Sequence, residues 1–437
     1  MKLNIRNFAK IKEADIVIDG ITVIAGENNT GKSTVGKVLF SLFNALSDID
    51  RKICDERLKE IEATNRNIML NYVSAIDFPR SVARQAAFNN ARNINRALRQ
   101  QLEDNFDIQE ESILEIVEKV ITNWGMATKS LENHDWSEMI DDVYRNTKEV
   151  MNLPEENIVK EVISRYFNNV FHSQIQSLSN KEDQDAVLTL NIKEKKEQIY
   201  FEKNNCKGFV SEINIIHKAI YIDNPFIVDE LSEYNDLNPM NQMLKDLLSD
   251  SYKEGILDGV IETVRVKEKL ANIFEMLQNV VNGEIIIDQN GEFYLKCNDY
   301  DEPISLQNLS TGMKSFVILK MLLEKGCLKN KDVVILDEPE IHLHPQWQIA
   351  YAELIVLLQK QFDLSVVVTT HSPYFVDAIN LFSCKYGTDS KVNYYLSSND
   401  GNMVTMESVT EEIDLIYKKM ASPIQMLDTL RYELNND

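Results

Sequence analysis

The chain has 437 residues, 44% of them hydrophobic and 26% charged, a composition typical of a globular protein with two or three domains. Its formal net charge of −23 excludes a surface that is basic throughout, because binding to nucleic-acid phosphates requires several charges to be neutralised at once. No apolar run approaches the roughly 20 residues of a membrane-spanning helix. The first residues, 1–5, predict a strand rather than a signal peptide, so we expect a cytoplasmic protein with no membrane contact.

The five cysteines are scattered along the chain and include no C-x-x-C pair. An odd set of this kind is typical of buried thiols in a reducing compartment, and it predicts neither disulfides nor a zinc site.

The first functional motif follows an apolar strand expected at residues 21–24. Residues 26–33 fit the pattern G-x-x-x-x-G-K-[ST], in which backbone N–H groups cradle phosphates, Lys32 reaches the β and γ oxygens and the Ser33 hydroxyl binds Mg²⁺. A helical apolar stripe over 35–46 would place the phosphate at a helix N-terminus. The candidate ATP-binding residues are Gly26, Glu27, Asn28, Asn29, Thr30, Gly31, Lys32, Ser33 and Thr34.

A long helical region follows this phosphate loop. Between Gly36 and Gly208 there is one other glycine, and there are only two prolines. A stretch so poor in helix breakers predicts helices over most of 35–182, with a polar break at 179–185. Because it shows no sustained heptads, we expect a compact helical insertion rather than a long coiled coil.

One segment of this insertion is basic in an otherwise acidic chain. Residues 78–102 contain no acidic residue, and five arginines recur there at spacings of four, eight, four and three, with Phe88 filling the longest gap. On a helix these arginines fall along one stripe. Two interpretations stay open: pairing with the chain's own carboxylates or another subunit, which we favour, and contact with nucleic acid. The arginines are Arg80, Arg84, Arg92, Arg96 and Arg99.

Strands are expected to return at 187–192, 198–202 and 218–222. Helices are then expected over 230–282, and a hairpin over 284–296 that turns at an Asn-Gly pair.

The second functional motif begins at Ser310, a natural N-cap for a helix over 311–325. An ordinary capped helix is one interpretation. However, the next apolar strand, 333–336, ends directly in Asp337 and Glu338. A run of this kind predicts a buried parallel strand, and doubly wound sheets bind ligands at the carboxyl ends of such strands.

A third apolar strand, 365–370, ends in His371. A lone histidine after a strand is more often structural than catalytic, but the order of the motifs favours a functional role here. A hairpin over 392–409 and an amphipathic helix complete the expected elements.

Together these motifs resemble the ATP-binding-cassette (ABC) superfamily. Within it the resemblance is greatest to the soluble SMC-like and RecF-like ATPases, particularly the overcoming-lysogeny-defect (OLD) group. It implies an α/β fold: an ABC-type ATPase head with a mixed or parallel sheet around the phosphate loop, a large helical insertion and a helical signature lobe. The segments that carry the resemblance are residues 26–34, 308–315 and 336–345.

The resemblance also implies a domain organisation. Lobe I of the ATPase head would combine 1–41, 186–229 and 326–437, with the helical insertion at 42–185. Lobe II, with the hairpin and the signature helix, would be 230–325.

The resemblance assigns a role to each residue around the phosphate loop. Asp337 and Ser33 would hold Mg²⁺ for bound ATP, and Glu338 would be the base that activates water. His371 would contact the γ-phosphate and sense its loss. Residues 223–225 stand where related ATPases keep a Mg²⁺-contacting Gln, although an ordinary Asn-Pro turn is the favoured interpretation there.

Ser310 and Gly312 would act in trans by closing over the γ-phosphate held by a second protomer. The active form would therefore be a homodimer joined through its ATP sites, possible also within a larger homo-oligomer. Transporter cassettes usually read L-S-G-G-Q, whereas Thr311 and Met313 replace one Gly and the Gln here, which weakens any transport role.

Only 66 residues follow His371, too few for the Toprim nuclease domain that OLD proteins append, and no nuclease metal cluster is evident. His342 and His344 look like the family's structural His-Pro turn. We therefore expect ATPase activity, and no nuclease activity from this chain alone.

The favoured function is the ATPase subunit of a prokaryotic antiviral defence complex, because the plan resembles the ATPases of the Septu, retron-associated and PARIS systems. The nuclease or toxin, of HNH or Toprim type, would be a separate chain. Two alternatives stay open: a RecF-like repair ATPase that binds DNA directly, and an ATP-gated scaffold with little turnover.

Overall fold

The computed structural model describes residues 1–75, 80–104, 108–127, 134–176, 184–233, 237–249, 270–297 and 300–436. They form two compact units, one of Met1–Ser47 with Val162–Asp437 and one of Asp48–Glu161. Each unit has a hydrophobic core of its own.

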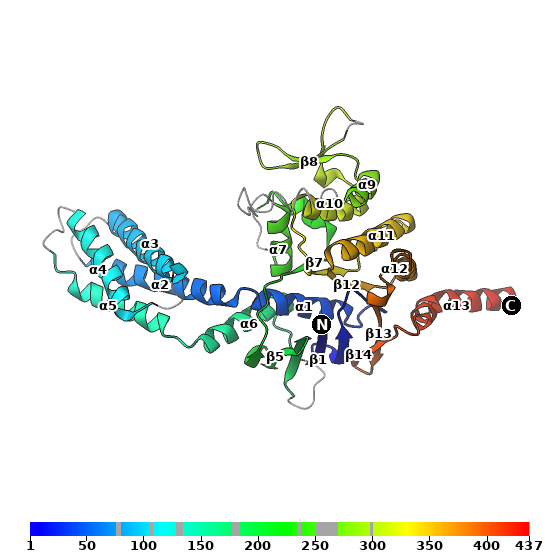
Figure 1. The fold of residues 1–437 in the computed structure, drawn as a ribbon, viewed down its shortest axis with the longest axis horizontal. Coiled ribbons are helices and arrows are strands. Elements are labelled where there is room, and N and C mark those ends of the chain that lie inside the picture. The colour runs from blue at the N-terminus through cyan, green and yellow to red at the C-terminus, as the bar shows by residue number, and fades with distance from the viewer. Residues whose placement is uncertain are drawn as a thin grey trace. The chain divides into compact units, whose positions relative to one another are not determined.

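The first unit is built on an 11-stranded mixed sheet (Figure 1). Its strands are β1 (Lys2–Phe8), β2 (Ile11–Val17), β3 (Ile21–Gly26), β4 (Ala186–Ile192), β5 (Lys195–Glu202), β6 (Asn205–Ser211), β7 (Ala219–Ile222), β11 (Val333–Asp337), β12 (Ser365–Thr370), β13 (Val392–Asp400) and β14 (Met403–Ser408). Their order is β6-β5-β4-β1-β2-β14-β13-β3-β12-β11-β7. The five strands from β13 to β7 are parallel, and those from β6 to β2 are antiparallel. The α/β fold class with a mixed sheet around the phosphate loop is therefore confirmed.

Every strand expected from the sequence is present, and two further strands of this large sheet, β2 and β6, were not predicted. The signal in β2 is weak because three charged residues interrupt its apolar positions, and β6 contains Gly208, which weakens any strand pattern.

Helices cover both faces of the parallel half of the sheet. One face contacts α1 (Lys32–Leu46), and alternate residues on the other face share a core with the remaining helices of this unit. Those helices are η1 (Pro225–Glu230), α7 (Pro239–Leu248), α9 (Ala271–Val280), η2 (Leu306–Asn308), α10 (Thr311–Glu324), α11 (Pro345–Phe362), α12 (Pro373–Tyr386) and α13 (Asp414–Asn436), with η3 (Asp389–Lys391) leading into β13.

The expected hairpin at 284–296 is confirmed as β8 (Glu284–Ile287) and β9 (Phe293–Lys296), which pair antiparallel. A third strand, β10 (Ile304–Ser305), adds to this small sheet and was not predicted. The helices expected over 230–282 are present as α7 and α9, while residues 250–269 lie outside the described part.

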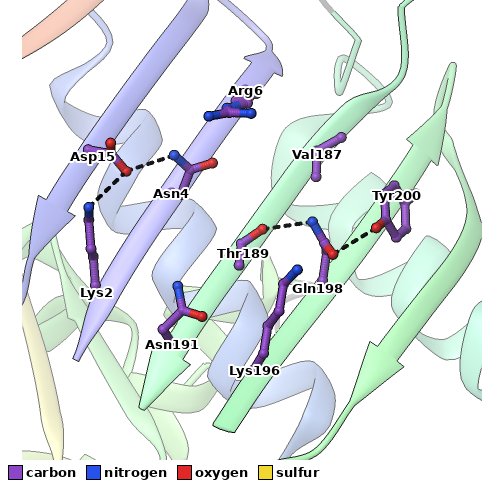
Figure 2. Close-up of a pocket in the computed structure, with 10 residues that line it drawn as sticks. All are labelled: Lys2, Asn4, Arg6, Asp15, Val187, Thr189, Asn191, Lys196, Gln198 and Tyr200. Atoms are coloured by element: carbon purple, nitrogen blue, oxygen red, sulfur yellow. Dashed lines mark hydrogen bonds and ion pairs between the residues drawn. The ribbon is translucent and has the colours of Figure 1, made fainter. Parts of the chain in front are cut away.

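The antiparallel half of the sheet buries only one face. Leu3 and Ile5 of β1 are fully buried on it, and Phe8 packs against Phe171 of α6 (Glu155–Phe171) with ring centroids 4.9 Å apart. The opposite face is polar and has an open hollow of about 650 Å³. Figure 2 shows residues that line it, with Lys2 beside Asp15. This alternation is what an antiparallel sheet with one solvated face requires.

The second unit is helical (Figure 1). It contains α2 (Ile49–Ser74), α3 (Arg80–Asp104), α4 (Glu110–Ala127), α5 (Ser137–Met151) and the first turns of α6, around a core that includes Ile61, Ile94 and Val117. None of the described helices in either unit is both long and apolar enough to span a membrane.

The compact helical unit, Asp48–Glu161, is shorter than the insertion expected at 42–185. Helix α1 continues to Leu46 on the sheet, and from Val162 onwards the chain again belongs to the sheet unit. The reason is aromatic packing, since Phe167 and Phe171 of α6 contact Phe8. Of the polar break expected at 179–185, residues 179–183 lie outside the described part.

Helix α1 approaches the sheet closely at Gly36. A Cβ atom at this position would lie 2.7 Å from Cγ2 of Ile335 on β11 and 3.1 Å from the ring of Tyr221 on β7. A side chain would therefore push the helix that carries the phosphate loop away from the strands beneath it.

We predict that Gly36→Ala lowers the free energy of unfolding by about 1–3 kcal/mol, the usual cost of overpacking a core. Helix propensity alone would raise the free energy of unfolding by about 1 kcal/mol, because Ala favours a helix more than Gly does. A lower free energy of unfolding would therefore indicate overpacking. Urea denaturation measures it. Gly208→Ala is the matched control, because nothing lies within 4 Å of a Cβ at that position. Equal stability losses in the two variants would contradict the close approach.

Candidate nucleotide-binding site

The candidate site lies where parallel strands end side by side. The phosphate loop follows β3, Asp337 ends β11, His371 follows β12 and Asp223 follows β7. Adjacent parallel strands bring these residues to one edge of the sheet, which is where open α/β sheets bind ligands.

The phosphate loop has a conformation that depends on glycine. Gly26 has φ +155° and Gly31 has φ +73°, both in the region that favours glycine, and Asn29 has φ +64°. A Cβ atom on Gly26 would lie 2.1 Å from Oγ of Ser397, its partner on β13. Glu27, Asn28 and Asn29 form the exposed tip of the loop.

Ser397 of β13 supports the loop from below, and the sequence did not predict it. Its single hydroxyl proton can go to the carbonyl of Ala25 at 3.2 Å or to the hydroxyl of Thr30 at 2.6 Å. Thr30, only 1% exposed, also donates to the carbonyl of Glu27 at 2.7 Å. The loop is thus fixed by side chains before any ligand binds.

Lys32 is buried, and its ammonium group points back into the loop. Its Nζ donates to the carbonyls of Gly26 at 3.1 Å and Glu27 at 2.8 Å, and lies 3.6 Å from Oε1 of Glu338. The first N–H groups of an α-helix have no partner within it, although that of Thr34 donates to the carbonyl of the N-cap residue Gly31 at 3.1 Å. A compact cation beside a helix N-terminus is suited to hold phosphate.

Asp337 is the most connected carboxylate of the site. Ser33 donates to its Oδ1 at 2.9 Å, Tyr221 donates to its Oδ2 at 2.6 Å, and Thr369 also donates to Oδ1. Burial, followed by the charge of Asp337, raises the pKa of Tyr221 well above its usual value, so this phenol stays protonated and remains a donor.

The donor set around Asp337 fits Mg²⁺. The Ser33 hydroxyl and the Asp337 carboxylate are hard oxygen donors within hydrogen-bonding distance of each other. Mg²⁺ in nucleotide sites is usually held by one or two such groups together with phosphates and waters. A second carboxyl, Asp223, follows β7 at the same edge of the sheet, and burial and then the charge of Asp337 raise its pKa.

Glu338 has an unusual backbone. Its φ is +51°, a conformation that costs energy in a residue with a side chain and that recurs at functional sites. Its N–H donates to the carbonyl and hydroxyl oxygens of Thr369 at 3.0 and 3.1 Å. This turn directs the carboxylate between Lys32 and His371, each with a nitrogen 3.6 Å from Oε1.

Glu340 connects the loop after β11 to the histidine, and the sequence did not predict this either. Only 3% of the Glu340 side chain is exposed, and burial raises the pKa of its carboxyl. Its Oε1 accepts from the Thr370 hydroxyl at 2.5 Å and the His371 N–H at 3.0 Å. Gln348 adds a second connection, because it donates to the Glu340 carbonyl and accepts from Ser372 at 2.8 Å.

Ser310 caps α10 as predicted, accepting from the N–H of Met313 at 3.4 Å. Gly312 packs under the loop after β11: a Cβ atom there would lie 2.9 Å from the His342 carbonyl and 3.1 Å from Trp347. Among the described residues, no hydrogen bond or ion pair joins Ser310 or Gly312 to the phosphate loop. Their role in trans stays a prediction.

Two residues that the sequence left open have structural roles. Asn224 accepts from the N–H of Phe226 at 2.9 Å and so caps η1, which is the ordinary Asn-Pro turn that we favoured. His344 caps α11 by accepting from the N–H of Gln346.

The arginine stripe divides into two parts. Arg99 forms an ion pair with Asp55 of α2 at 2.8 Å, so the favoured interpretation holds for that residue. Arg84, Arg92 and Arg96 are exposed on α3. The side chain of Arg80 lies outside the described part.

A family model described as an AAA ATPase domain matches residues 1–376. The chain belongs to this family. Membership in an ATPase family agrees with the phosphate loop and the acidic pair after β11, and it implies nucleotide binding, usually with Mg²⁺. The roles of the individual site residues stay predictions.

Relatives within named systems match over shorter stretches. The chain is 30% identical to the Septu protein PtuA of Bacillus thuringiensis over 157 residues, which is 33% of each chain. It is 30% identical to the retron Ec83 probable ATPase of Escherichia coli over 122 residues, covering 25% of this chain and 20% of that protein. The expected resemblance to Septu and retron ATPases is thus confirmed, although the chain spans only a fifth to a third of their length.

Solved structures similar to the chain include an SMC head bound to the C-terminal winged-helix domain of ScpA. The TM-score is 0.43 at 13% identity, over 95% of this chain and 98% of that one. The SMC head domain from Thermotoga maritima matches with a TM-score of 0.39 at 10% identity, over 93% and 98%.

We predict that Ser397→Ala weakens ATP binding about 2–10-fold, because one supporting hydroxyl contributes about 0.5–1.5 kcal/mol to the loop conformation. Titration calorimetry measures the change. Ser398→Ala is the matched control, since successive side chains of a strand point to opposite faces and Ser398 therefore faces away from the loop. If both variants bind ATP like the unmodified chain, Ser397 does not hold the loop.

Proposed function

We propose that this chain is an ATP-hydrolysing subunit of a prokaryotic antiviral defence complex, in which ATP-dependent dimerisation controls a separate effector. The observation that carries the ATPase proposal is the convergence of Ser33, Tyr221 and Thr369 on Asp337, with Glu338 directed between Lys32 and His371. The defence assignment is supported by the Septu and retron relatives and extends beyond the short stretches that match.

The site residues suggest how hydrolysis proceeds. Lys32 and the loop N–H groups would neutralise charge on the β and γ phosphates, and Ser33 and Asp337 would hold Mg²⁺, which supplies further neutralisation when bound. Glu338 would take a proton from the attacking water as its oxygen bonds to the γ-phosphorus. The bond from that phosphorus to the β–γ bridging oxygen then breaks, giving ADP and phosphate.

His371 would report on the γ-phosphate. Its backbone N–H donates to Glu340, and its Nδ1 lies 3.6 Å from Oε1 of Glu338. Loss of the phosphate would therefore shift contacts to the loop after β11, which carries both carboxylates. That same loop contacts Gly312 of α10 through the His342 carbonyl. A mechanical connection of this kind would let hydrolysis alter the surface presented by Ser310.

The second protomer would complete the site. Ser310 and Gly312 of one chain would close over the ATP held by the other, so ATP would join the two protomers and its hydrolysis would release them. The effector would be a separate nuclease or toxin, of HNH or Toprim type, in the cytoplasm. A RecF-like role on DNA is the second candidate, favoured by the exposed arginines of α3.

The Glu338→Gln variant should bind ATP normally but hydrolyse it about 10² to 10⁴-fold more slowly, because only the general base is removed. Its ATP-bound form should then accumulate as a dimer, which light scattering after size exclusion would detect. Unchanged turnover in this variant would refute the assignment of the base.

A second substitution separates binding from dimerisation. Adding Ser310→Arg to Glu338→Gln should return the ATP-bound chain to the mass of the ATP-free chain while leaving its ATP affinity unchanged, because the blocked surface belongs to the other protomer's site. A dimer that persists in the double variant would contradict the composite site.

A further inference from the structure

The exposed face of α3 carries positive charge without internal partners. Arg84, Arg92 and Arg96 are exposed, and no ion pair among the described residues involves them. Phe88, 41% exposed, lies one turn from Arg84 and one turn from Arg92. The helix therefore presents cations and an aromatic ring to solvent along one side.

This arrangement is unusual in a chain with 69 acidic and 46 basic residues. Some cations on other surfaces are paired: Lys2 with Asp15 and Arg6 with Glu13 on the open sheet face, and the half-buried Lys148 with Glu110 in the helical unit. Surface pairing of this kind cancels local charge. The charge of the three arginines of α3 is not cancelled in this way by any described residue.

A groove lies between α3 and α4, and its lining includes Asn93 and Ala97, the chain neighbours of Arg92 and Arg96. Its volume is about 850 Å³, and the described residues of its walls include six carboxamides, one lysine, one tryptophan and no carboxylate. The lining residues are Asn89, Asn90, Asn93, Ala97, Gln100, Gln101, Ile116, Lys119, Val120, Asn123 and Trp124.

The chemistry of this groove identifies the ligand class. A carboxamide both donates and accepts hydrogen bonds, which matches the mixed donor and acceptor edges of nucleobases, whereas an acidic peptide would require more cations inside the groove. Arginines beside it match phosphates, and the rings of Phe88 and Trp124 can stack on bases.

The shape of the surface selects among nucleic acids. A concave groove can receive a base only when that base has left its stack, and single strands offer such bases. In a duplex the base edges lie at the floor of the DNA grooves. A protruding protein helix can reach them there, whereas a concave protein surface cannot.

We propose that the α3–α4 face is a single-stranded nucleic-acid site, in which Arg84, Arg92 and Arg96 hold the phosphates and the carboxamide groove receives unstacked bases. The site uses no residue of the nucleotide site. Its test does not depend on ATP hydrolysis, so the two proposals can fail separately.

Fluorescence anisotropy with labelled mixed-sequence single-stranded DNA and RNA tests the proposal on the full chain. The triple charge reversal Arg84→Glu, Arg92→Glu and Arg96→Glu should weaken binding more than tenfold. It should also lower the slope of log affinity against log salt by about 2, since three phosphate contacts contribute roughly 0.7 each. The matched control reverses Lys193, Lys195 and Lys203, exposed residues of the sheet unit, to Glu and should change affinity little.

A second variant tests the groove independently of charge. Asn89→Ala, Asn93→Ala and Gln100→Ala together should weaken binding about 3–10-fold and leave the salt slope unchanged, because no phosphate contact is lost. Unchanged circular dichroism and urea denaturation show that the helical unit of each variant is folded. The triple substitution of the arginines by Lys should keep most of the affinity.

Several outcomes would overturn the proposal. The unmodified chain could fail to bind single strands, or reversing the three control lysines could weaken binding as much as reversing the arginines. Binding could be tighter to duplex than to single strands, with no effect of the carboxamide variant. Polyglutamate at matched charge could also displace the nucleic acid fully. The last result would indicate an acidic protein partner instead.

Discussion

The architecture of the site depends on one carboxylate, Asp337. Its two oxygens accept from Ser33 on the helix after β3, from Tyr221 on β7 and from Thr369 on β12. These groups come from separate parts of the chain and meet only because β3, β12, β11 and β7 are neighbours in that order. Hydrogen bonds to a charged acceptor are stronger than those between neutral groups, so this half-buried hub fixes the phosphate loop relative to the acidic pair.

The rest of the site is positioned by close contacts around that hub. Gly36 lets α1 lie directly on β11 and β7, and Gly26 lets the phosphate loop lie directly on Ser397 of β13. The strained turn at Glu338 and the buried carboxylate of Glu340 then set the spacing between the acidic pair and His371. Pre-organisation of this kind suits phosphoryl transfer, which relies on positioning and charge neutralisation more than on covalent chemistry.

Local motifs could be read from the sequence, whereas their supports could not. The phosphate loop, the strand before Asp337 and the cap at Ser310 are encoded within short segments, so they were predicted. Tyr221, Ser397 and Glu340 act through contacts with residues far away in the chain, and a single sequence carries no periodic signal for such pairs. The same limit explains why the predicted helical insertion is longer than the compact helical unit. Phe167 lies within the predicted insertion, but it packs against Phe8 and belongs to the sheet unit.

The most direct test of the hub is single-turnover ATP hydrolysis by Tyr221→Phe, which removes one donor to Asp337 and keeps the ring that packs against Phe40. A hydrogen bond to a charged group contributes about 1.5–3 kcal/mol, so we predict a rate lower by about tenfold or more. Tyr394→Phe is the matched control, because that buried hydroxyl has no hydrogen-bond partner among the described residues. Equal rates in the two variants and the unmodified chain would contradict the central role of Asp337.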